Sequence, residues 1–209
     1  MQLSKLLSRT LSILAFSVAG LLATSASAQS QNYLEVTPAQ PSDTTGKIEV
    51  LEFFAYNCPH CNALQPMIEN WAKTLPDNVV VRPVPVAFNA KMADMQRMYY
   101  TLEALDRLDL HSAFFHALHD EHKRLFDAAP MADWAAEQGI DKATFESVFK
   151  SFGVSTKLAR ANELTNAYKV EGTPTLAIGG RYVTSPSMTN SYEATITQAQ
   201  ALLDRILNK

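Results

Sequence analysis

The sequence predicts an α/β fold whose sheet-forming part is interrupted by a long helical region. Between residues 48 and 86, an apolar run, a helical pattern and a second apolar run follow one another as strand, helix and strand. From residue 91 to about residue 168 the apolar spacing is helical, and two short strands and a final helix end the chain. With 209 residues, 47% of them hydrophobic, the chain is long enough for one packed domain that carries an insertion.

The first strand is predicted over Ile48–Tyr56, an apolar run rich in β-branched and aromatic residues, and a helix is predicted over Pro59–Leu75. The second strand, Val79–Val86, contains Pro83 and Pro85. Because these prolines are two residues apart, both missing N–H groups fall on one side of the strand, and the other side remains free to pair. We therefore predict two parallel strands joined by a right-handed helical crossover.

The helical region is divided where Asp, Gly and Pro residues interrupt its periodicity, at 106–109, 128–130 and 139–141. The predicted helices are Met92–Leu105, His111–Phe126, Met131–Gln138, Lys142–Ser151 and Val154–Tyr168. After this region, two short apolar runs flank Gly179-Gly180, which predicts a β-hairpin. An amphipathic pattern predicts the last helix over Tyr192–Leu207. A further short strand is expected near Tyr33–Val36.

The first 28 residues have the pattern of a cleavable export signal. Lys5 and Arg9 precede an apolar stretch from residue 11 to residue 23, and Ala26-Ser27-Ala28 is a small-residue cleavage site. An uncleaved membrane anchor is the alternative, but the stretch is shorter than the roughly 18 residues that a spanning helix needs. Export implies an oxidising compartment, where cysteines take part in disulfide chemistry. The net charge of −3 and the lack of a basic run argue against nucleic acid as a partner.

The two cysteines of the chain, Cys58 and Cys61, stand where the first strand passes into the first helix. Cys58 is expected at the helix N-terminus, where unpaired N–H groups and the helix dipole stabilise a thiolate, with Cys61 one turn further in and more buried. A disulfide across so short a gap gains little from loop closure, which favours a redox bond over a structural one. Half of a zinc site is the alternative, although the sequence offers no second ligand pair of that spacing.

Two polar residues near the cysteines are further candidates. His60, in the first helical turn, can donate a hydrogen bond toward the Cys58 sulfur or place positive charge beside it, and both favour the thiolate. A stabilised thiolate makes the disulfide a stronger oxidant. Glu52 lies in an otherwise apolar strand, where a carboxylate is costly unless it has a task or a partner. The alternative is a side chain that reaches solvent, as we expect for Glu49.

Four histidines gather in the helical region. The last three recur at intervals of three residues on one predicted helix, so that only neighbouring ones approach each other. We predict that they belong to a solvated helix face, with metal binding as the alternative. These residues are His111, His116, His119 and His122.

The order of these features resembles the DsbA family. The resemblance is carried by Glu52-Phe53-Phe54 before Cys58-Pro59-His60-Cys61, and by Gly172-Thr173-Pro174 before the hairpin and the last helix. It spans nearly all of the chain after the export signal and implies a thioredoxin fold with an inserted all-helical subdomain. The implied division is a signal peptide (1–28), a first thioredoxin-like part (29–89), a helical insertion (90–155) and a second thioredoxin-like part (156–209).

The resemblance also implies roles for the site residues. Cys58 forms the mixed disulfide with substrate, Cys61 resolves it, and Pro59 and His60 between them set the redox character. Glu52 is implied to be a buried acid that moves protons to or from Cys61.

The resemblance further implies a substrate-binding loop. By composition alone a trans peptide would be expected before Pro174. The family instead implies a cis Thr173–Pro174 bond in a loop that faces the cysteines and pairs with an extended substrate. Thr173 departs from the best-known members, which have valine at that position.

The function implied by the resemblance is that of a dithiol oxidase in the periplasm of a Gram-negative cell. It donates the Cys58–Cys61 disulfide to newly exported proteins, requires no organic cofactor or metal, and is reoxidised by a quinone-linked membrane partner of the DsbB type. We expect a monomer. Two alternatives remain: a disulfide isomerase or reductase, and a chaperone-like module that holds unfolded exported chains. DsbC-type isomerases carry an N-terminal dimerisation domain, for which the segment before Cys58 is too short.

Overall fold

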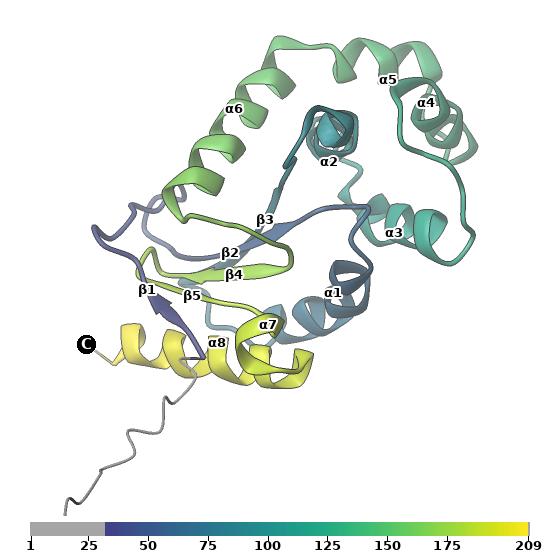
Figure 1. The fold of residues 1–209 in the computed structure, drawn as a ribbon. Helices are drawn as coiled ribbons and strands as arrows, with labels where there is room; N and C mark the ends of the chain where they lie inside the picture. Colours follow the sequence, from purple (N-terminus) through teal and green to yellow (C-terminus); the bar gives the residue numbers. More distant parts are fainter. Residues whose placement is uncertain (1–31, 209) are drawn as a thin grey trace, which may run out of the picture.

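The computed structural model describes residues 32–208, and a mixed five-stranded sheet lies at its centre (Figure 1). The strands are β1 (Leu34–Glu35), β2 (Ile48–Phe54), β3 (Val79–Pro85), β4 (Thr175–Ile178) and β5 (Tyr182–Thr184). Their order is β1-β5-β4-β2-β3, in which β2 and β3 are parallel and β4 is antiparallel to both of its neighbours. The predicted α/β class is confirmed. The export signal predicted over residues 1–28 lies outside the described residues.

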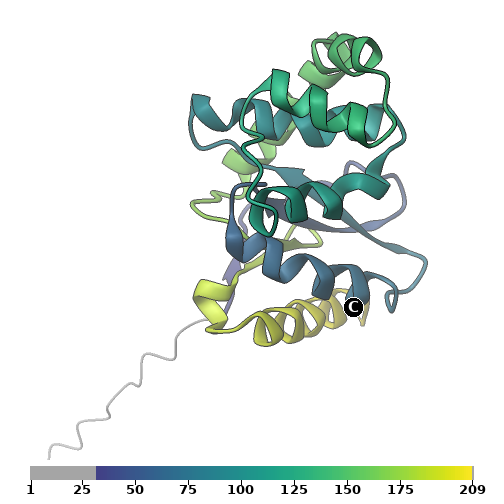
Figure 2. The same ribbon diagram turned by 90° about the vertical axis from the view of Figure 1, so that its right-hand side faces the viewer.

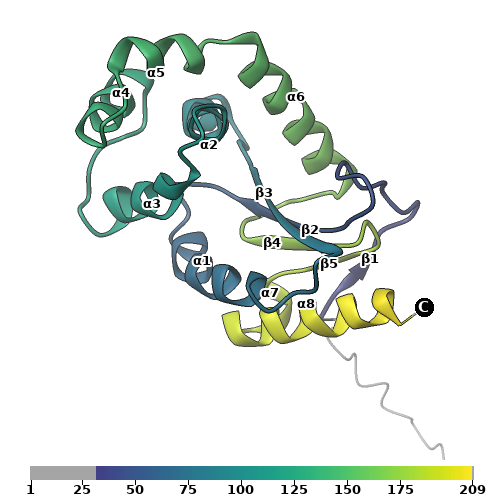
Figure 3. The same ribbon diagram turned by 180° about the vertical axis from the view of Figure 1, so that it is seen from behind.

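The helices cover the sheet and form a separate helical region. They are α1 (Pro59–Ala72), α2 (Ala93–Ala104), α3 (His111–His119), α4 (Ala128–Glu137), α5 (Lys142–Phe149), α6 (Phe152–Ala167), α7 (Pro186–Thr189) and α8 (Tyr192–Leu207). Two 3₁₀ turns, η1 (Ala90–Met92) and η2 (Leu108–Leu110), precede α2 and α3. Helices α1, α7 and α8 lie on one side of the sheet, and the region from α2 to α6 rises on the other (Figures 1, 2 and 3). Within residues 32–208, no helix is long and apolar enough to cross a membrane.

Strand β3 lies at the edge of the sheet and pairs with β2 in the predicted parallel orientation. Pro83 stands opposite Glu52, and Pro85 stands opposite Phe54. Two prolines are tolerated here because an edge strand needs its N–H groups on one side only. The strand–helix–strand unit around the cysteines is confirmed.

Side chains of β2 alternate between the two faces of the sheet and so fix the position of Glu52. Val50 packs with Leu64 of α1 and Leu202 of α8 in one cluster of buried residues. Phe53 packs instead in the cluster that includes the buried side chains of α2 and α6. Because alternate residues of a strand share a face, Glu52 lies on the same face as Val50, under α1.

Helix α3 is shorter than predicted and ends at His119 rather than Phe126. His122 adopts a left-handed backbone conformation (φ 56°), and the N–H of Lys123 bonds back to the carbonyl of Ala117 at 2.8 Å. This arrangement closes a helix end. His122 therefore does not lie on the helix with the other histidines, and the predicted row of three is wrong.

Other helix ends also differ from the sequence prediction. Helix α4 begins at Ala128, so that Pro130 lies in its first turn instead of forming the predicted break. Proline is accepted there because the first N–H groups of a helix have no partner within it. Helix α1 ends at Ala72, earlier than the predicted Leu75. Helix α6 begins at Phe152 and ends at Ala167, within two residues of the predicted Val154–Tyr168.

The hairpin between β4 and β5 turns at Gly179 and Gly180, as predicted. Both residues have positive φ, 56° and 71°, which favours glycine. A Cβ atom on Gly180 would also collide with the carbonyl oxygen of Gln40, whose N–H donates to the Gly180 carbonyl at 2.8 Å. The turn thus fastens the N-terminal segment to the sheet.

Candidate active site

Cys58 is the N-cap residue of α1, directly after the end of β2. Its backbone is extended (φ −92°, ψ 112°), and Pro59 occupies the start of the helix. Its sulfur accepts a hydrogen bond from the backbone N–H of Cys61 at 3.3 Å. Both cysteines are free thiols in this structure; Cys61 is buried, whereas Cys58 is partly exposed. Cys58 is therefore the sulfur that a second molecule can reach.

The two thiols differ strongly in acidity. A hydrogen bond from the Cys61 thiol, opposed by burial, lowers the pKa of Cys58 to about 5. The side chain of Thr173 and the backbone N–H groups of Cys61 and His60 add to this lowering. Burial raises the pKa of Cys61 far above its usual value, and its contact with Cys58 raises it further. At neutral pH the pair is therefore a thiolate at Cys58 and a thiol at Cys61.

The loop before β4 lies against Cys58, although 115 residues separate the two in sequence. The Thr173–Pro174 peptide is cis, as the family resemblance implied. The thiol form of Cys58 donates to the carbonyl oxygen of Thr173, 3.3 Å away. Thr175 is paired with Phe53 in the sheet, which holds the loop beside the end of β2. The structure thus brings Thr173 and Pro174 together with the cysteines.

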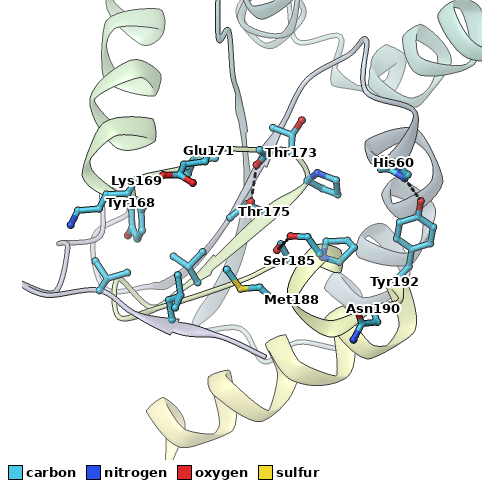
Figure 4. A pocket seen from close by; sticks show the side chains of 18 of the residues that line it. His60, Tyr168, Lys169, Glu171, Thr173, Thr175, Ser185, Met188, Asn190 and Tyr192 are labelled. Atoms are coloured by element: carbon cyan, nitrogen blue, oxygen red, sulfur yellow. Dashed lines mark hydrogen bonds between the residues drawn. The ribbon is translucent and has the colours of Figure 1, made fainter. Parts of the chain in front are cut away.

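The imidazole of His60 is turned toward Tyr192, not toward the Cys58 sulfur. Its Nδ1 lies 2.7 Å from the Tyr192 hydroxyl, at the start of α8 (Figure 4). Within residues 32–208, no hydrogen bond joins the ring to Cys58. The expected hydrogen bond from the His60 side chain is therefore not formed, and His60 acts on Cys58 through its backbone N–H. Sequence reasoning missed Tyr192.

Glu52 is fully buried, and neither of its carboxyl oxygens has a hydrogen-bond partner within the described chain. Burial raises the pKa of this carboxyl to about 8, and the charge of Glu69 raises it further. The alternative of a side chain in contact with solvent is thus wrong for Glu52. It is also wrong for Glu49, which is buried and forms an ion pair with Arg82 at 3.0 Å.

A groove of about 1120 Å³ opens beside the cis-proline loop (Figure 4). Its walls are the loop itself, β1, His60 and the segment from Ser185 to Glu193, which includes α7. Concave sites of this size accommodate ligands, and an extended peptide fits such a site beside a backbone that is free to pair. Helix α7 was not predicted. Ser185-Pro186, an N-cap residue before a proline at the first helical position, was its available signal.

The histidines of α3 do not form the solvated row that was predicted. His111 is buried, and its Nδ1 lies 2.8 Å from the Tyr56 hydroxyl. His119 Nε2 lies 2.7 Å from the Tyr56 carbonyl oxygen and donates to it. His116 is exposed, as expected. Across residues 32–208, no group of three or more His, Cys, Asp or Glu side chains is arranged to hold a metal ion.

These features define a class of protein. A C-x-x-C pair at a helix start, faced by a cis-proline loop at the end of a mixed sheet, is the dithiol–disulfide site of a thioredoxin-like protein. Comparison with family models agrees, since residues 39–101 match the thioredoxin model and residues 77–196 match the DSBA-like thioredoxin domain. The chain belongs to the DsbA family of thiol:disulfide oxidoreductases.

Individual relatives and solved structures give the same result. A thiol:disulfide interchange protein DsbA of Bordetella parapertussis is 51% identical over 197 residues, covering 93% of this chain and 94% of the relative. A DsbA of Pseudomonas aeruginosa is 36% identical and covers 84% and 83% of the two chains. A crystal structure of P. aeruginosa DsbA superposes with a TM-score of 0.80, at 35% identity over 85% of this chain and 93% of the other. The thioredoxin fold with a helical insertion is confirmed.

Proposed function

We propose that this protein is a periplasmic dithiol oxidase that donates its Cys58–Cys61 disulfide to newly exported proteins. A substrate thiolate attacks the Cys58 sulfur, the Cys58–Cys61 bond breaks, and Cys61 leaves with the electron pair and takes up a proton. A second substrate thiolate then attacks the substrate sulfur of the mixed disulfide, and Cys58 leaves as a thiolate. The substrate loses two electrons in forming its disulfide, and the enzyme gains them.

The difference in acidity between the two cysteines carries this proposal. A low pKa stabilises the reduced form, because reduction releases Cys58 as a thiolate that its surroundings favour. The pKa falls from 9.0 to about 5. At pH 7 only the part of this fall that lies below ambient pH counts, about two units (7 − 5), and at about 30 mV for each unit in a two-electron couple it moves the potential by roughly 60 mV. This shift favours transfer of the disulfide to substrate.

The other site residues support the exchange. Pro59 and His60 place backbone N–H groups and the helix start around the thiolate, and Glu52 moves protons to and from Cys61. The backbone of Thr173, beside Pro174, pairs with an extended substrate segment that occupies the groove. The hydroxyl of Thr173, absent from members that have valine there, adds to the lowering of the Cys58 pKa.

The partners follow from the same chemistry. Substrates are unfolded, newly exported chains with reduced cysteines, and each turnover leaves the enzyme reduced. A membrane quinone reductase of the DsbB type restores the disulfide, so that the protein itself needs no cofactor. Proteins of the DsbA family generally work in the periplasm, and the export signal predicted over residues 1–28 supports the same location for this chain.

The decisive experiment is the redox equilibrium of the mature protein with glutathione, combined with a pH titration of Cys58. We expect a strongly oxidising potential and a thiolate that persists well below neutral pH. A potential near that of thioredoxin, about −270 mV, would contradict the oxidase direction and favour a reductase.

Single-cysteine variants test the mechanism. The Cys58→Ser variant should lose oxidation of a reduced, unfolded substrate, because it has no sulfur that the substrate can attack. The Cys61→Ser variant cannot form the Cys58–Cys61 disulfide and should also lose oxidation of reduced substrate. Given a disulfide reagent such as oxidised glutathione, it should instead accumulate the mixed disulfide at Cys58, because the thiol that would displace it is missing. Oxidation retained by Cys58→Ser would refute the mechanism, and prevention of aggregation by a variant without both cysteines would favour the chaperone-like alternative.

A further inference from the structure

Three buried side chains stand out because their polar atoms lack partners. Within residues 32–208, the buried side-chain atoms without a hydrogen bond are both carboxyl oxygens of Glu52, Oε1 of Gln65 and Nε2 of His111. Buried polar atoms in native proteins are nearly always paired, since leaving one unpaired costs about 1–3 kcal/mol. A set of such atoms beneath a redox site therefore calls for a functional explanation.

The three side chains lie where β2, α1 and α3 meet, a place that we call the polar junction. Glu52 is on the face of β2 that α1 covers, and Gln65 is on the buried side of α1. His111 begins α3, and its ring packs against Phe54 and Tyr56, which follow Glu52 in the chain. Helices α1 and α3 are themselves in contact.

A stripe of side chains on α1 connects the polar junction with solvent. Cys61, Gln65 and Glu69 are spaced four residues apart and therefore share one face of the helix. Gln65 Nε2 donates to Glu69 Oε1 at 3.2 Å, and Ser112 Oγ of α3 donates to the same oxygen at 2.6 Å. Glu69 is exposed, whereas Gln65 and Cys61 are buried. The stripe thus leads from the resolving cysteine to the surface, and the charge of Glu69 at its outer end reaches Glu52.

The exchange reaction needs such a connection. When substrate attacks Cys58, Cys61 leaves as a thiolate and takes the proton of the Glu52 carboxyl, which becomes a carboxylate. Both residues have no exposed surface. The carboxylate must regain a proton from solvent before the cycle continues, because a buried and unpaired charge is strongly unfavourable.

Other titratable groups around Glu52 are poor carriers of this proton. Burial raises the pKa of Tyr56 and of Tyr99, and the charge of Glu52 adds to both effects. Burial lowers the pKa of His111 to about 4. These groups stay neutral near pH 7, whereas Glu69 is an exposed carboxylate whose charge reaches both Glu52 and His111.

We propose that Gln65 and Glu69 form the route by which the Glu52 carboxyl exchanges its proton with solvent, with His111 bounding the polar junction on the side of α3. Glu69 receives the proton at the surface. Gln65 is a positioning residue, whose amide holds Glu69 while its free Oε1 faces no other partner in the described chain. The inference rests on the proposed role of Glu52 in the oxidase.

The S–H group of Cys61 can be observed directly. The chain has two cysteines, and Cys58 is a thiolate at pH 7, so the Raman S–H stretching band of the reduced mature protein reports Cys61 alone. The rate at which this band is replaced by S–D after transfer into D₂O measures proton exchange at Cys61. It does so without substrate or turnover.

We expect Gln65→Leu and Glu69→Gln each to slow this exchange about tenfold, and Glu52→Gln to slow it by roughly a hundredfold, the lower end of what a positioned acid or base contributes. The matched control is Glu146→Gln, which removes the same charge from an exposed position of α5 and should leave the rate unchanged. If Gln65→Leu fails to fold, Gln65→Met removes the amide and keeps the length of the side chain.

A merely structural role of Gln65 would give a different result. Gln65→Leu should keep the wild-type redox equilibrium with glutathione and the wild-type titration of Cys58. A proton route changes the rate of proton exchange at Cys61, but not the redox equilibrium or the pKa of Cys58. Exchange at the wild-type rate in both Gln65→Leu and Glu69→Gln would overturn the route and show that the proton leaves past Cys58. The potential of the unmodified protein decides the proposed function separately.

Discussion

At the scale of single residues, the buried carboxyl of Glu52 lowers the stability of the folded protein at neutral pH. Burial, and then the charge of Glu69, raise its pKa from 4.5 to about 8. In the unfolded chain the carboxyl loses its proton at the lower value, while the folded protein retains it. The folded state therefore becomes less stable as pH rises from about 4.5 to about 8.

The Glu52→Gln variant should accordingly be more stable than the parent protein at pH 7. The expected gain is on the order of 3 kcal/mol, because the neutral amide has no proton to lose in the unfolded state. Urea unfolding of the oxidised protein at pH 7 and at pH 4 measures it. At pH 4 the carboxyl is protonated in both states, and the two proteins should differ little. An equal gain at both pH values would show that packing, and not ionisation, sets the cost.

The residues of the site were predictable to different degrees. Cys58 and Cys61 stand in one short motif, and the strand before them and the helix after them follow from local periodicity. The direction of the His60 ring depends on Tyr192, which lies 132 residues later. No local sequence pattern predicts this contact, because the fold of the whole chain brings His60 and Tyr192 together.

At the scale of secondary-structure elements, α3 fastens the helical region to the segment that carries Cys58. His119, the last residue of α3, donates from Nε2 to the Tyr56 carbonyl at 2.7 Å, and His111 holds the Tyr56 hydroxyl at 2.8 Å. Tyr56 precedes Cys58 by two residues, and the N–H of Cys58 bonds to the carbonyl of Ala55 at 3.0 Å. The conformation of the segment is therefore set from two sides.

Replacement of His119 by alanine should loosen this segment. We expect a loss of about 1–2 kcal/mol in the free energy of unfolding, because the Tyr56 carbonyl loses its donor, and a rise in the pKa of Cys58. Thermal unfolding and thiolate absorbance measure the two effects. His119→Gln, which retains an N–H donor, should restore much of both. His116→Ala, on the exposed side of the same helix, is the control, and equal losses in the two alanine variants would contradict the proposed anchoring.

The elements themselves were easier to predict than their ends. Strands β2 and β3 and helix α8 follow from residues close in sequence, and α8 has the predicted bounds, Tyr192–Leu207. The end of α3 does not follow in this way, because the apolar spacing continues to Phe126 although the helix stops at His119. The left-handed His122 follows three residues later, and although histidine is enriched in that conformation, it adopts it too rarely to predict a helix end.

At the scale of the whole molecule, a network of charges joins four parts of the chain at the end of the sheet remote from Cys58. Arg82 of β3 pairs with Glu49 of β2 and with Asp43 of the N-terminal segment, both at 3.0 Å. Arg160 of α6 binds the same Asp43 at 2.7 Å. The network thus links the sheet with the long helix that returns from the helical region. Its members differ in exposure, from 5% for the Glu49 side chain to 40% for that of Arg160.

The difference in exposure predicts which ion pairs of the network contribute most to stability. Glu49→Gln should lower the free energy of unfolding by about 1.5–3 kcal/mol, because it leaves a charged, half-buried Arg82 without the more buried of its two carboxylate partners. Arg160→Ala should cost at most about 1 kcal/mol, since solvent screens an exposed pair. Chemical unfolding at neutral pH measures both losses. The redox potential should not change in either variant, because the network lies at the opposite end of β2 from the cysteines.

The pH dependence of the Glu49→Gln effect gives the final check. Burial raises the pKa of Glu49, but the hydrogen bonds from Arg82 and Thr44 outweigh it and hold the pKa below 4.5. A carboxyl with a lowered pKa stabilises the folded state above its unfolded pKa, and this contribution disappears as pH falls through the folded value. The parent protein and the variant should therefore differ most near neutral pH and converge once the pH falls below the lowered pKa of Glu49. A difference that stays constant as the pH is lowered through the pKa of Glu49 would mean that the carboxylate charge does not hold the network together.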